Sequence, residues 1–552
     1  MSTETGKENE NNKGNSGFLL QGAILAASGI ISSLIGLMYR LPLTRIIGDE
    51  GNGYYSAAYN VYTIILLLSS YSLPLAVSKM VSARIGRNSP RNAKRILNAS
   101  LGYATLVGGA GFLIIWFGAG WFADSFLKMH FAMLPLRALA PTVWIVSYLG
   151  VLRGYYQGHS TMVPTALSQI IEQIVNALVS VGAAFLLVRF ALRSGLTGPS
   201  VRSMGAMGGT IGTGAGALSA LIMFLALYAL TAKKRKKALA EDKTFHVESY
   251  SEITQVLFMT VVPVILSTAI YNMSGILDSA IFGHAMAWAG LMHRTAADYG
   301  IYTAKYKLLI NVPVSIANSM SSSLIPALSR AHAARDRKQV DSSISMAVRF
   351  AMIVAIPSAV GMAVMAGPII DLLFGPSPKA VEMMRFGAWG VIFYSLSTVT
   401  NAVLQGTSHM RVPVRHALLS MAIHVVILGA LLTVFRMGIF GVVAADMAFA
   451  LCMCILNARS IKNLLTYRQE WRRTFLLPAF CAAVMGLVTF CVKELLRHTV
   501  RIRLAGTVLP ILAAIAVYAV LLVRTGCLNE SELRRFPKGA SLVRLFKKLH
   551  LL

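Results

Sequence analysis

The sequence is poor in charge, in cysteine and in the short motifs of catalytic chemistry. Charged residues make up 13% of 552 residues, and there are five cysteines. Cys452 and Cys454 are two residues apart with no second Cys or His pair nearby, which excludes both a zinc motif and a disulfide framework. A P-loop, a His-Glu-x-x-His motif and a nucleophile elbow are also missing. We therefore expect no enzymatic activity, no cofactor and no metal site.

Apolar stretches, in contrast, fill most of the chain. The mean hydropathy is +0.63, and runs of about 20 apolar residues, long enough to cross a bilayer as a helix, recur fourteen times. The sequence therefore predicts an all-α polytopic membrane protein with fourteen transmembrane helices. The expected spans are 17–39, 53–78, 97–123, 131–152, 160–188, 205–231, 253–283, 299–328, 344–371, 381–405, 413–435, 438–458, 474–493 and 504–523.

Basic residues are distributed unevenly between the loops. Most of the 51 Lys and Arg residues fall on one side if the N-terminus is cytoplasmic, as the positive-inside rule requires. We therefore predict a multi-pass plasma-membrane protein with both termini in the cytoplasm. The formal net charge of +29 is spread over alternate loops, which favours anionic membrane lipids as partners and disfavours nucleic acid.

The basic segment 231–249 is the longest polar interruption and divides the spans into two groups of six. A Gln-Gly turn followed by Met and Pro recurs at 157–164 and 405–413, six spans apart. Together with the equal number of spans on each side it supports two related lobes, although each could also be a simple cytoplasmic turn. The expected parts are a disordered cytoplasmic tail (1–16), an N-lobe (17–232), a basic linker (233–252), a C-lobe (253–461), a C-terminal helix pair (462–525) and a basic cytoplasmic tail (526–552).

Polar residues recur at helical spacing in four spans, so that each set shares one face. The four sets are Lys307, Asn311, Ser315, Asn318 and Ser322; Ser267, Tyr271, Ser274 and Asp278; Gln169, Glu172, Gln173 and Asn176; and Gln21, Ser28, Ser32 and Tyr39. Ionisable groups in lipid are costly and face a cavity or a partner. We therefore expect a shared water-filled cavity between the lobes.

Arg40, Lys305 and Lys307 would make this cavity cationic and suited to a diphosphate. The candidate substrate-binding residues are Arg40, Lys305, Lys307, Asn311, Asn318, Asp278, Tyr39 and Tyr59, and the candidates for coupling or gating are Glu172, Gln173, Asp446 and Arg153.

Each candidate has an alternative role. The three cations could reach the membrane interface instead, and Asp278 and Glu172 could be neutral or paired structural residues. Asp446 and His424 could make interhelical hydrogen bonds or couple ions. The tyrosines at 54, 55, 59 and 62 could form an interfacial aromatic belt or a platform for a sugar.

Three segments give the chain a family resemblance: IIGDEGNGYY (46–55) running on to LPLAVSKMVS (73–82), RGYYQGHSTMVPTALSQIIEQ (153–173) and INVPVSIANSMSSSLIPALSRA (310–331). With them the chain resembles the polysaccharide exporters of the MOP superfamily, within the SpoVB/YtgP group related to the MurJ flippases. The resemblance implies two lobes around a central cavity and alternating access. It also implies arginines along that cavity, for which this chain has Ser33, Tyr39 and Arg40 in its first span and Lys307 near the expected position in 299–328.

The resemblance further implies a flippase that moves an undecaprenyl-diphosphate-linked saccharide to the outer leaflet of a bacterial membrane, with the peptidoglycan precursor lipid II as the leading cargo. Cell-wall synthesis enzymes are further expected partners. Three alternatives remain open: a flippase for another wall or capsule polymer or for spore cortex precursor, a cation-coupled multidrug exporter of the same superfamily, and a scaffold for wall-synthesis enzymes.

Overall fold

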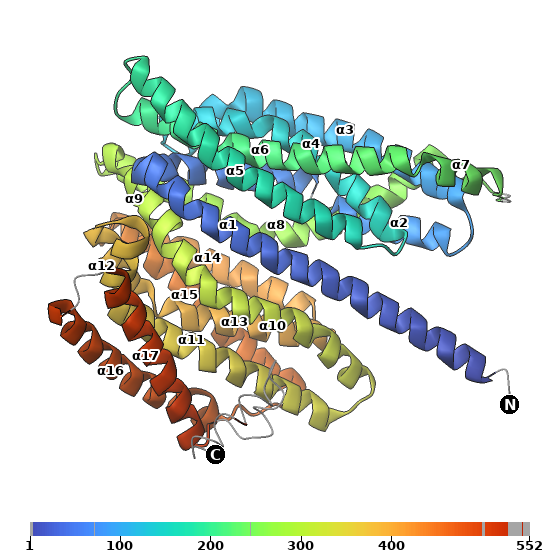
Figure 1. Ribbon diagram of the computed structural model, residues 1–552. Coiled ribbons are helices and arrows are strands. Elements are labelled where there is room, and N and C mark those ends of the chain that lie inside the picture. Colours follow the sequence, from blue (N-terminus) through green and yellow to red (C-terminus); the bar gives the residue numbers. More distant parts are fainter. Residues whose placement is uncertain are drawn as a thin grey trace. The chain divides into compact units, whose positions relative to one another are not determined.

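The computed structural model describes residues 4–70, 72–242, 244, 246–499, 503–527 and 544, and in these residues all regular structure is helical (Figure 1). The side chains of Gln21, Ser267 and Tyr271 lie outside the described part, as does most of the expected C-terminal tail. The chain divides into two compact units, Met1–Gly300 and Ile301–Leu552.

The first unit contains helices α1 to α9. Their bounds are α1 Glu4–Ser69, α2 Leu73–Ile85, α3 Pro90–Trp121, α4 Met133–Gly158, α5 Val163–Arg193, α6 Pro199–Leu230, α7 Ala232–Ala240, α8 Tyr250–Trp288 and α9 Met292–Ile301. The second unit contains a π-helix, Tyr302–Lys307, followed by α10 Leu308–Ala333, α11 Arg337–Phe374, α12 Pro378–Gly387, α13 Gly390–Gly406, α14 Arg411–Thr433, α15 Ile439–Leu465, the π-helix Arg472–Leu476, α16 Leu477–Thr499 and α17 Arg503–Arg524.

In the part of the chain that the structure describes, fewer than fourteen segments are long and apolar enough to cross a membrane. Among the described residues eleven helical segments qualify, or twelve if the bent pair α12–α13 is one span. One of the eleven, 27–85, covers two of the expected spans in a single segment. The all-α membrane fold is therefore confirmed, whereas the count of fourteen is not.

Two boundaries differ from the expected organisation. Helix α1 begins at Glu4, so residues 4–16 are helical where we expected a disordered tail; this segment contains no proline that would stop the helix from extending. The division between the units falls at Gly300, and α8 therefore belongs to the first unit. The division into lobes at 233–252 stays a prediction.

The linker after α7 is attached to the turn between α2 and α3. The Arg84 guanidinium makes two parallel hydrogen bonds to the Glu248 carboxylate, at 2.9 and 3.0 Å. The Asn92 side chain donates to the carbonyl of His246 at 2.9 Å and accepts from the backbone N–H of Glu248 at 3.1 Å. The segment around 246–248 is thus a fixed part of the first unit and not a free tether.

Helix α1 is interrupted at Gly48, whose φ of 69° lies in the left-handed region. The side-chain amide of Asn52 donates to the carbonyl of Gly48 at 2.7 Å and to that of Thr44 at 3.3 Å, which satisfies backbone groups at the break. The segment IIGDEGNGYY therefore encodes a kink together with its own hydrogen-bond partner.

Glycines also set how closely the helices of the first unit approach. A Cβ atom at Gly53 would overlap the carbonyl oxygen of Ala296 in α9. In α6, a Cβ at Gly208, Gly212 or Gly216 would overlap or crowd atoms of α5. The Gly-rich stretch 205–216 therefore serves close helix packing through small residues.

The two Gln-Gly turns have the same backbone geometry. Ser160 and Ser408 adopt positive φ angles of 58° and 65°. Each donates its N–H to the carbonyl three residues earlier, at 2.9 and 3.2 Å. A Cβ at Gly158 would lie 2.7 Å from the Cβ of Val81 in α2, and one at Gly406 would lie 2.9 Å from the Cβ of Leu328 in α10. Both glycines are thus contact positions for a neighbouring helix, which supports the predicted relationship between the two groups of spans.

The C-terminal hairpin α16–α17 packs against α11 (Figure 1). The Tyr518 hydroxyl of α17 donates to the carbonyl of Ile353 at 3.0 Å, and a Cβ at Gly486 of α16 would lie 2.6 Å from Cγ1 of Val360. The hairpin is therefore an addition on one helix of the second unit, as its position at the end of the sequence suggests.

We predict that Gly53→Ala prevents the correct packing of α1 against α9. The added methyl group collides with a backbone carbonyl, which cannot move aside as a flexible side chain could. Overpacking of this kind costs about 1–3 kcal/mol or more. The measurement is the thermal unfolding midpoint and the monodispersity of purified protein. Gly102→Ala is the matched control, because a Cβ there meets no atom within 4 Å. Equal behaviour of the two variants would contradict this account of the motif.

Candidate ligand-binding site

In the first unit, the expected polar faces of α1 and α5 lie against each other. The Ser28 hydroxyl donates to Oε1 of Gln169 at 2.9 Å, and the Asn176 amide donates to the Tyr39 hydroxyl at 3.3 Å. A Cβ atom at Gly36 would lie 3.8 Å from Oε1 of Gln173. Two of the four polar faces therefore satisfy each other in part, so they do not all line one open cavity along their full length.

Arg40 lies among tyrosines of its own helix. Its guanidinium carbon is 5.1 Å from the centroid of the Tyr55 ring, a cation–π distance. Tyr39 and Tyr59 are close enough to interact with it electrostatically. The side chain is half-buried. In the described part of the chain, no carboxylate forms a salt bridge with Arg40, and the groups that stabilise its charge are aromatic rings and hydroxyls.

The tyrosine cluster is buried and does not form an interfacial belt. Tyr54, Tyr55 and Tyr62 expose 4%, 2% and 2% of their surface. The rings of Tyr55 and Tyr59 stack with centroids 5.9 Å apart, and Tyr59 tilts against Tyr62 at 5.4 Å. Burial thus disfavours the interfacial belt, and a platform for a sugar stays a prediction.

Arg153 and Glu172 form a salt bridge between α4 and α5. Nη2 of Arg153 lies 2.6 Å from Oε2 of Glu172, and its Nε donates to the Ser168 hydroxyl at 3.1 Å. Both side chains are largely buried, with exposures of 16% and 22%. The structure therefore gives Glu172 the paired structural role that we considered, and any role in gating has to operate by breaking this pair.

In the second unit, Lys307 and Asp446 come together from distant parts of the sequence. Nζ of Lys307 lies 3.0 Å from Oδ2 of Asp446 and 4.8 Å from the centroid of the Tyr302 ring. The Tyr302 hydroxyl donates a short hydrogen bond to the same carboxylate oxygen. Asp446 is buried, whereas the Lys307 side chain stays 34% exposed. Lys307, which we predict to bind substrate, is thus paired with Asp446, which we predict to take part in coupling or gating.

The π-helix Tyr302–Lys307 makes this cluster possible. Its wider turn begins with Tyr302 and ends with Lys307, so that both side chains reach Asp446. Insertions of this kind often mark functional sites. No sequence pattern indicates the wide turn, so Tyr302 is not among the candidate residues named from the sequence.

His424 contributes an interhelical hydrogen bond to the same region of the second unit. It is fully buried, and its Nδ1 lies 3.0 Å from the carbonyl oxygen of Ala445 in α15. Because a carbonyl only accepts, Nδ1 carries a proton. Hydrogen bonds between helices are thus present at both His424 and Asp446.

The remaining candidates divide by exposure. Lys305 is buried, with 5% of its surface exposed. This burial disfavours the alternative in which its side chain reaches the membrane interface. Asn311 and Asn318 are exposed on α10, as are Ser315 and Ser322, which confirms that these four share one uncovered face. Asp278 is fully buried in α8 of the first unit.

Comparison with known proteins identifies the relatives of the chain. The profile of a family described as "Polysaccharide biosynthesis protein" matches residues 19–332, and that of the MatE family matches residues 263–431. Stage V sporulation protein B of Bacillus subtilis is 27% identical over 532 residues, covering 94% of this chain and 98% of that protein.

Two further relatives are flippases by name. Lipid II flippase MurJ of Bacillus subtilis is 26% identical, covering 94% of this chain and 97% of that protein. A solved structure of lipid II flippase MurJ in an inward closed conformation shares the fold, with a TM-score of 0.62 at 14% identity, and covers 90% of this chain and 98% of that one.

We predict that Lys307→Ala destabilises the protein and that adding Asp446→Asn restores most of the stability. The single change leaves a buried carboxylate without its cation, which costs about 3–5 kcal/mol for a fully buried pair. The lower end applies here because Lys307 is partly exposed. Thermal unfolding in detergent measures the effect, with the exposed Lys338→Ala as control. If the double variant is no more stable than Lys307→Ala, the two residues do not act as a pair.

Proposed function

Since the chain belongs to the polysaccharide biosynthesis protein family of MOP superfamily transporters, we propose that it is a flippase for an undecaprenyl-diphosphate-linked saccharide. In this proposal it moves the lipid from the inner to the outer leaflet by alternating access, with lipid II as the leading cargo. The membrane is the bacterial plasma membrane, and both termini are cytoplasmic. The transport step makes and breaks no covalent bond.

Moving a polar head group across a bilayer requires a protein that carries polar groups inside the membrane. A diphosphate and its sugars cannot cross hydrocarbon unaided, because removing charge and hydroxyl groups from water without replacement partners is expensive. A protein solves this by supplying cations and hydrogen-bond donors inside the membrane while the polyprenyl tail stays in lipid. Directional movement then needs a gradient or the membrane potential, which acts on any net charge that crosses.

The observation that carries the proposal is the environment of Arg40. A half-buried guanidinium held by tyrosines keeps its donors free of a competing carboxylate. Guanidinium groups bind phosphate oxygens through two parallel hydrogen bonds. We assign Arg40 to phosphate binding in the first unit, with Tyr39 and Tyr59 as flanking hydroxyl donors.

The second unit contributes a cation whose partner can be exchanged. Lys307 is held by Asp446, so a phosphate that binds Lys307 would weaken this salt bridge and free Asp446 to take up a proton or a cation. In this assignment Lys305, Asn311, Asn318 and Asp278 belong to the substrate-binding set. Asp446, Glu172, Gln173 and Arg153 belong to coupling or gating.

We predict that Arg40→Ala lowers the rate of transport about 10- to 100-fold, because a hydrogen bond to a charged group contributes about 1.5–3 kcal/mol. Arg40→Lys should retain part of the rate. The measurement is leaflet accessibility of a defined polyprenyl-diphosphate saccharide in proteoliposomes. Arg193→Ala, an exposed arginine at the end of α5, is the control. Wild-type rates in Arg40→Ala would argue against phosphate binding at this site.

Depletion in cells separates the alternatives. Accumulation of lipid II with growth arrest supports the leading cargo. Normal growth with defective spores supports a precursor used in sporulation, an outcome that the similarity to stage V sporulation protein B keeps open. Drug resistance on overexpression, with unchanged lipid intermediates, supports a multidrug exporter, which the MatE match over 263–431 keeps open. Full complementation by both Lys307→Ala and Arg40→Ala would favour a scaffold for wall-synthesis enzymes.

A further inference from the structure

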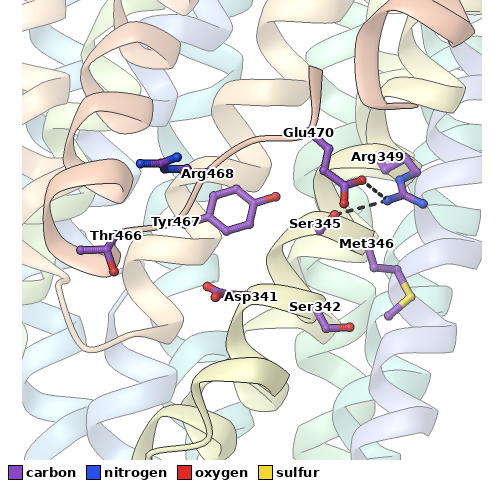
Figure 2. Close-up of a pocket in the computed structure, with 9 residues that line it drawn as sticks. All are labelled: Asp341, Ser342, Ser345, Met346, Arg349, Thr466, Tyr467, Arg468 and Glu470. Carbon is purple, nitrogen blue, oxygen red and sulfur yellow. Dashed lines mark hydrogen bonds and ion pairs between the residues drawn. The ribbon is translucent and has the colours of Figure 1, made fainter. Parts of the chain in front are cut away.

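Two pockets adjoin each other in the second unit, where the chain leaves α15. The first has a volume of about 470 Å³ and a polar lining that includes Asp341, Ser342, Ser345 and Arg468 (Figure 2). The second has a volume of about 670 Å³ and is walled largely by apolar side chains of α11, α13 and α15. Tyr467 and Arg468 line both pockets, so one short segment separates a polar compartment from an apolar one.

Charged and polar side chains that contact one another line the polar pocket. Nη2 of Arg349 lies 2.6 Å from Oε2 of Glu470 and 3.4 Å from the Ser345 hydroxyl. The Tyr467 ring lies in the middle of the lining residues with its hydroxyl directed toward Ser345 and Glu470, and Asp341 lies below the ring in this view (Figure 2). The pocket is thus lined both by cations and by carboxylates, which accept hydrogen bonds.

The apolar pocket has a basic rim. Its floor includes the buried side chains of Ile344, Val348 and Cys454. Arg459, Lys462 and Arg468 also line it and are exposed. These three cations belong to the basic loop that the positive-inside rule assigns to the cytoplasmic side.

We propose that these pockets bind one anionic glycerophospholipid of the inner leaflet. Its phosphate lies at Arg459, Lys462 and Arg468, one acyl chain fills the apolar pocket, and its hydroxyl-bearing head group reaches the polar pocket. Apolar walls beneath a cluster of cations match the two parts of such a lipid. Asp341 and Glu470 are acceptors for the head-group hydroxyls, as in phosphatidylglycerol.

The same features disfavour the flippase cargo as the occupant. A diphosphate would meet the carboxylates of Asp341 and Glu470, and like charges repel in a site of low dielectric constant. An undecaprenyl chain is more than twice as long as an acyl chain, whereas the apolar pocket of about 670 Å³ is of the size that holds one small ligand, about 300–1,000 Å³. The site is therefore separate from phosphate binding at Arg40 and does not depend on the proposed transport.

The bound lipid would join α11 to the segment that leads into the C-terminal hairpin. Tyr467 and Arg468 precede the π-helix Arg472–Leu476, which packs against α11. A ligand that binds only the folded state stabilises it. Loss of the lipid should accordingly lower the stability of the second unit.

The test measures phosphatidylglycerol bound to the purified full-length protein. Lipid is quantified by mass spectrometry after exchange in micelles that contain phosphatidylglycerol or phosphatidylcholine, and thermal unfolding is followed in parallel. Ala458→Phe fills the apolar pocket without changing charge. Ile455→Phe, an exposed position on the same helix that does not line the pocket, is its control. A triple variant, Arg459→Gln/Lys462→Gln/Arg468→Gln, removes the rim, and Lys233→Gln/Lys234→Gln/Lys237→Gln removes the same charge from α7.

We expect Ala458→Phe and the rim variant each to bind about one phosphatidylglycerol fewer per protein and to lose its thermal stabilisation, while both controls bind as the wild type. Phosphatidylcholine should not stabilise the wild type to the same degree. Equal phosphatidylglycerol binding in all variants would overturn the proposal. Displacement of the phosphatidylglycerol by undecaprenyl phosphate at equal concentration would assign the pocket to the cargo instead, and this too would overturn it.

Discussion

A charged side chain in a membrane-crossing helix needs partners inside the protein, and the arrangement of both units follows from this constraint. In the first unit Arg153 is neutralised by Glu172, and in the second Lys307 is neutralised by Asp446. The first pair joins the consecutive helices α4 and α5, whereas the second joins elements that are distant in the sequence. Arg40 differs from these two cations because its charge is stabilised by aromatic rings and hydroxyls and not by a carboxylate in the described part of the chain.

This difference matters for transport. A carboxylate partner competes with an anionic ligand for the same cation, whereas an aromatic partner leaves the hydrogen-bond donors of the guanidinium available. The proposed flippase therefore has two kinds of phosphate contact. Under that proposal Arg40 would be preorganised for binding, and Lys307 would bind only by giving up Asp446, so that its occupancy would depend on the protonation or ion binding of that carboxylate.

Features that depend on local periodicity could be predicted from the sequence. The helical class follows from the apolar runs, and the shared face of Asn311 and Asn318 follows from helical spacing. The Lys307–Asp446 contact could not be predicted, because it joins positions that are distant in the sequence and depends on a wide helical turn. The burial of Tyr55 could not be predicted for a related reason. The local sequence around a tyrosine does not distinguish a position at the membrane boundary from one packed between helices.

The paired turns extend this argument to the organisation of the chain. Ser160 and Ser408 share a left-handed conformation and the same hydrogen-bond offsets, and the glycine two residues before each packs on the helix two spans earlier. The two turns thus share both the backbone geometry and the relative position of the contacted span. Replacement of Gly158 or Gly406 by a larger residue would break the same contact in either unit. The two turns therefore follow one packing rule, as the predicted relationship between the two groups of spans requires.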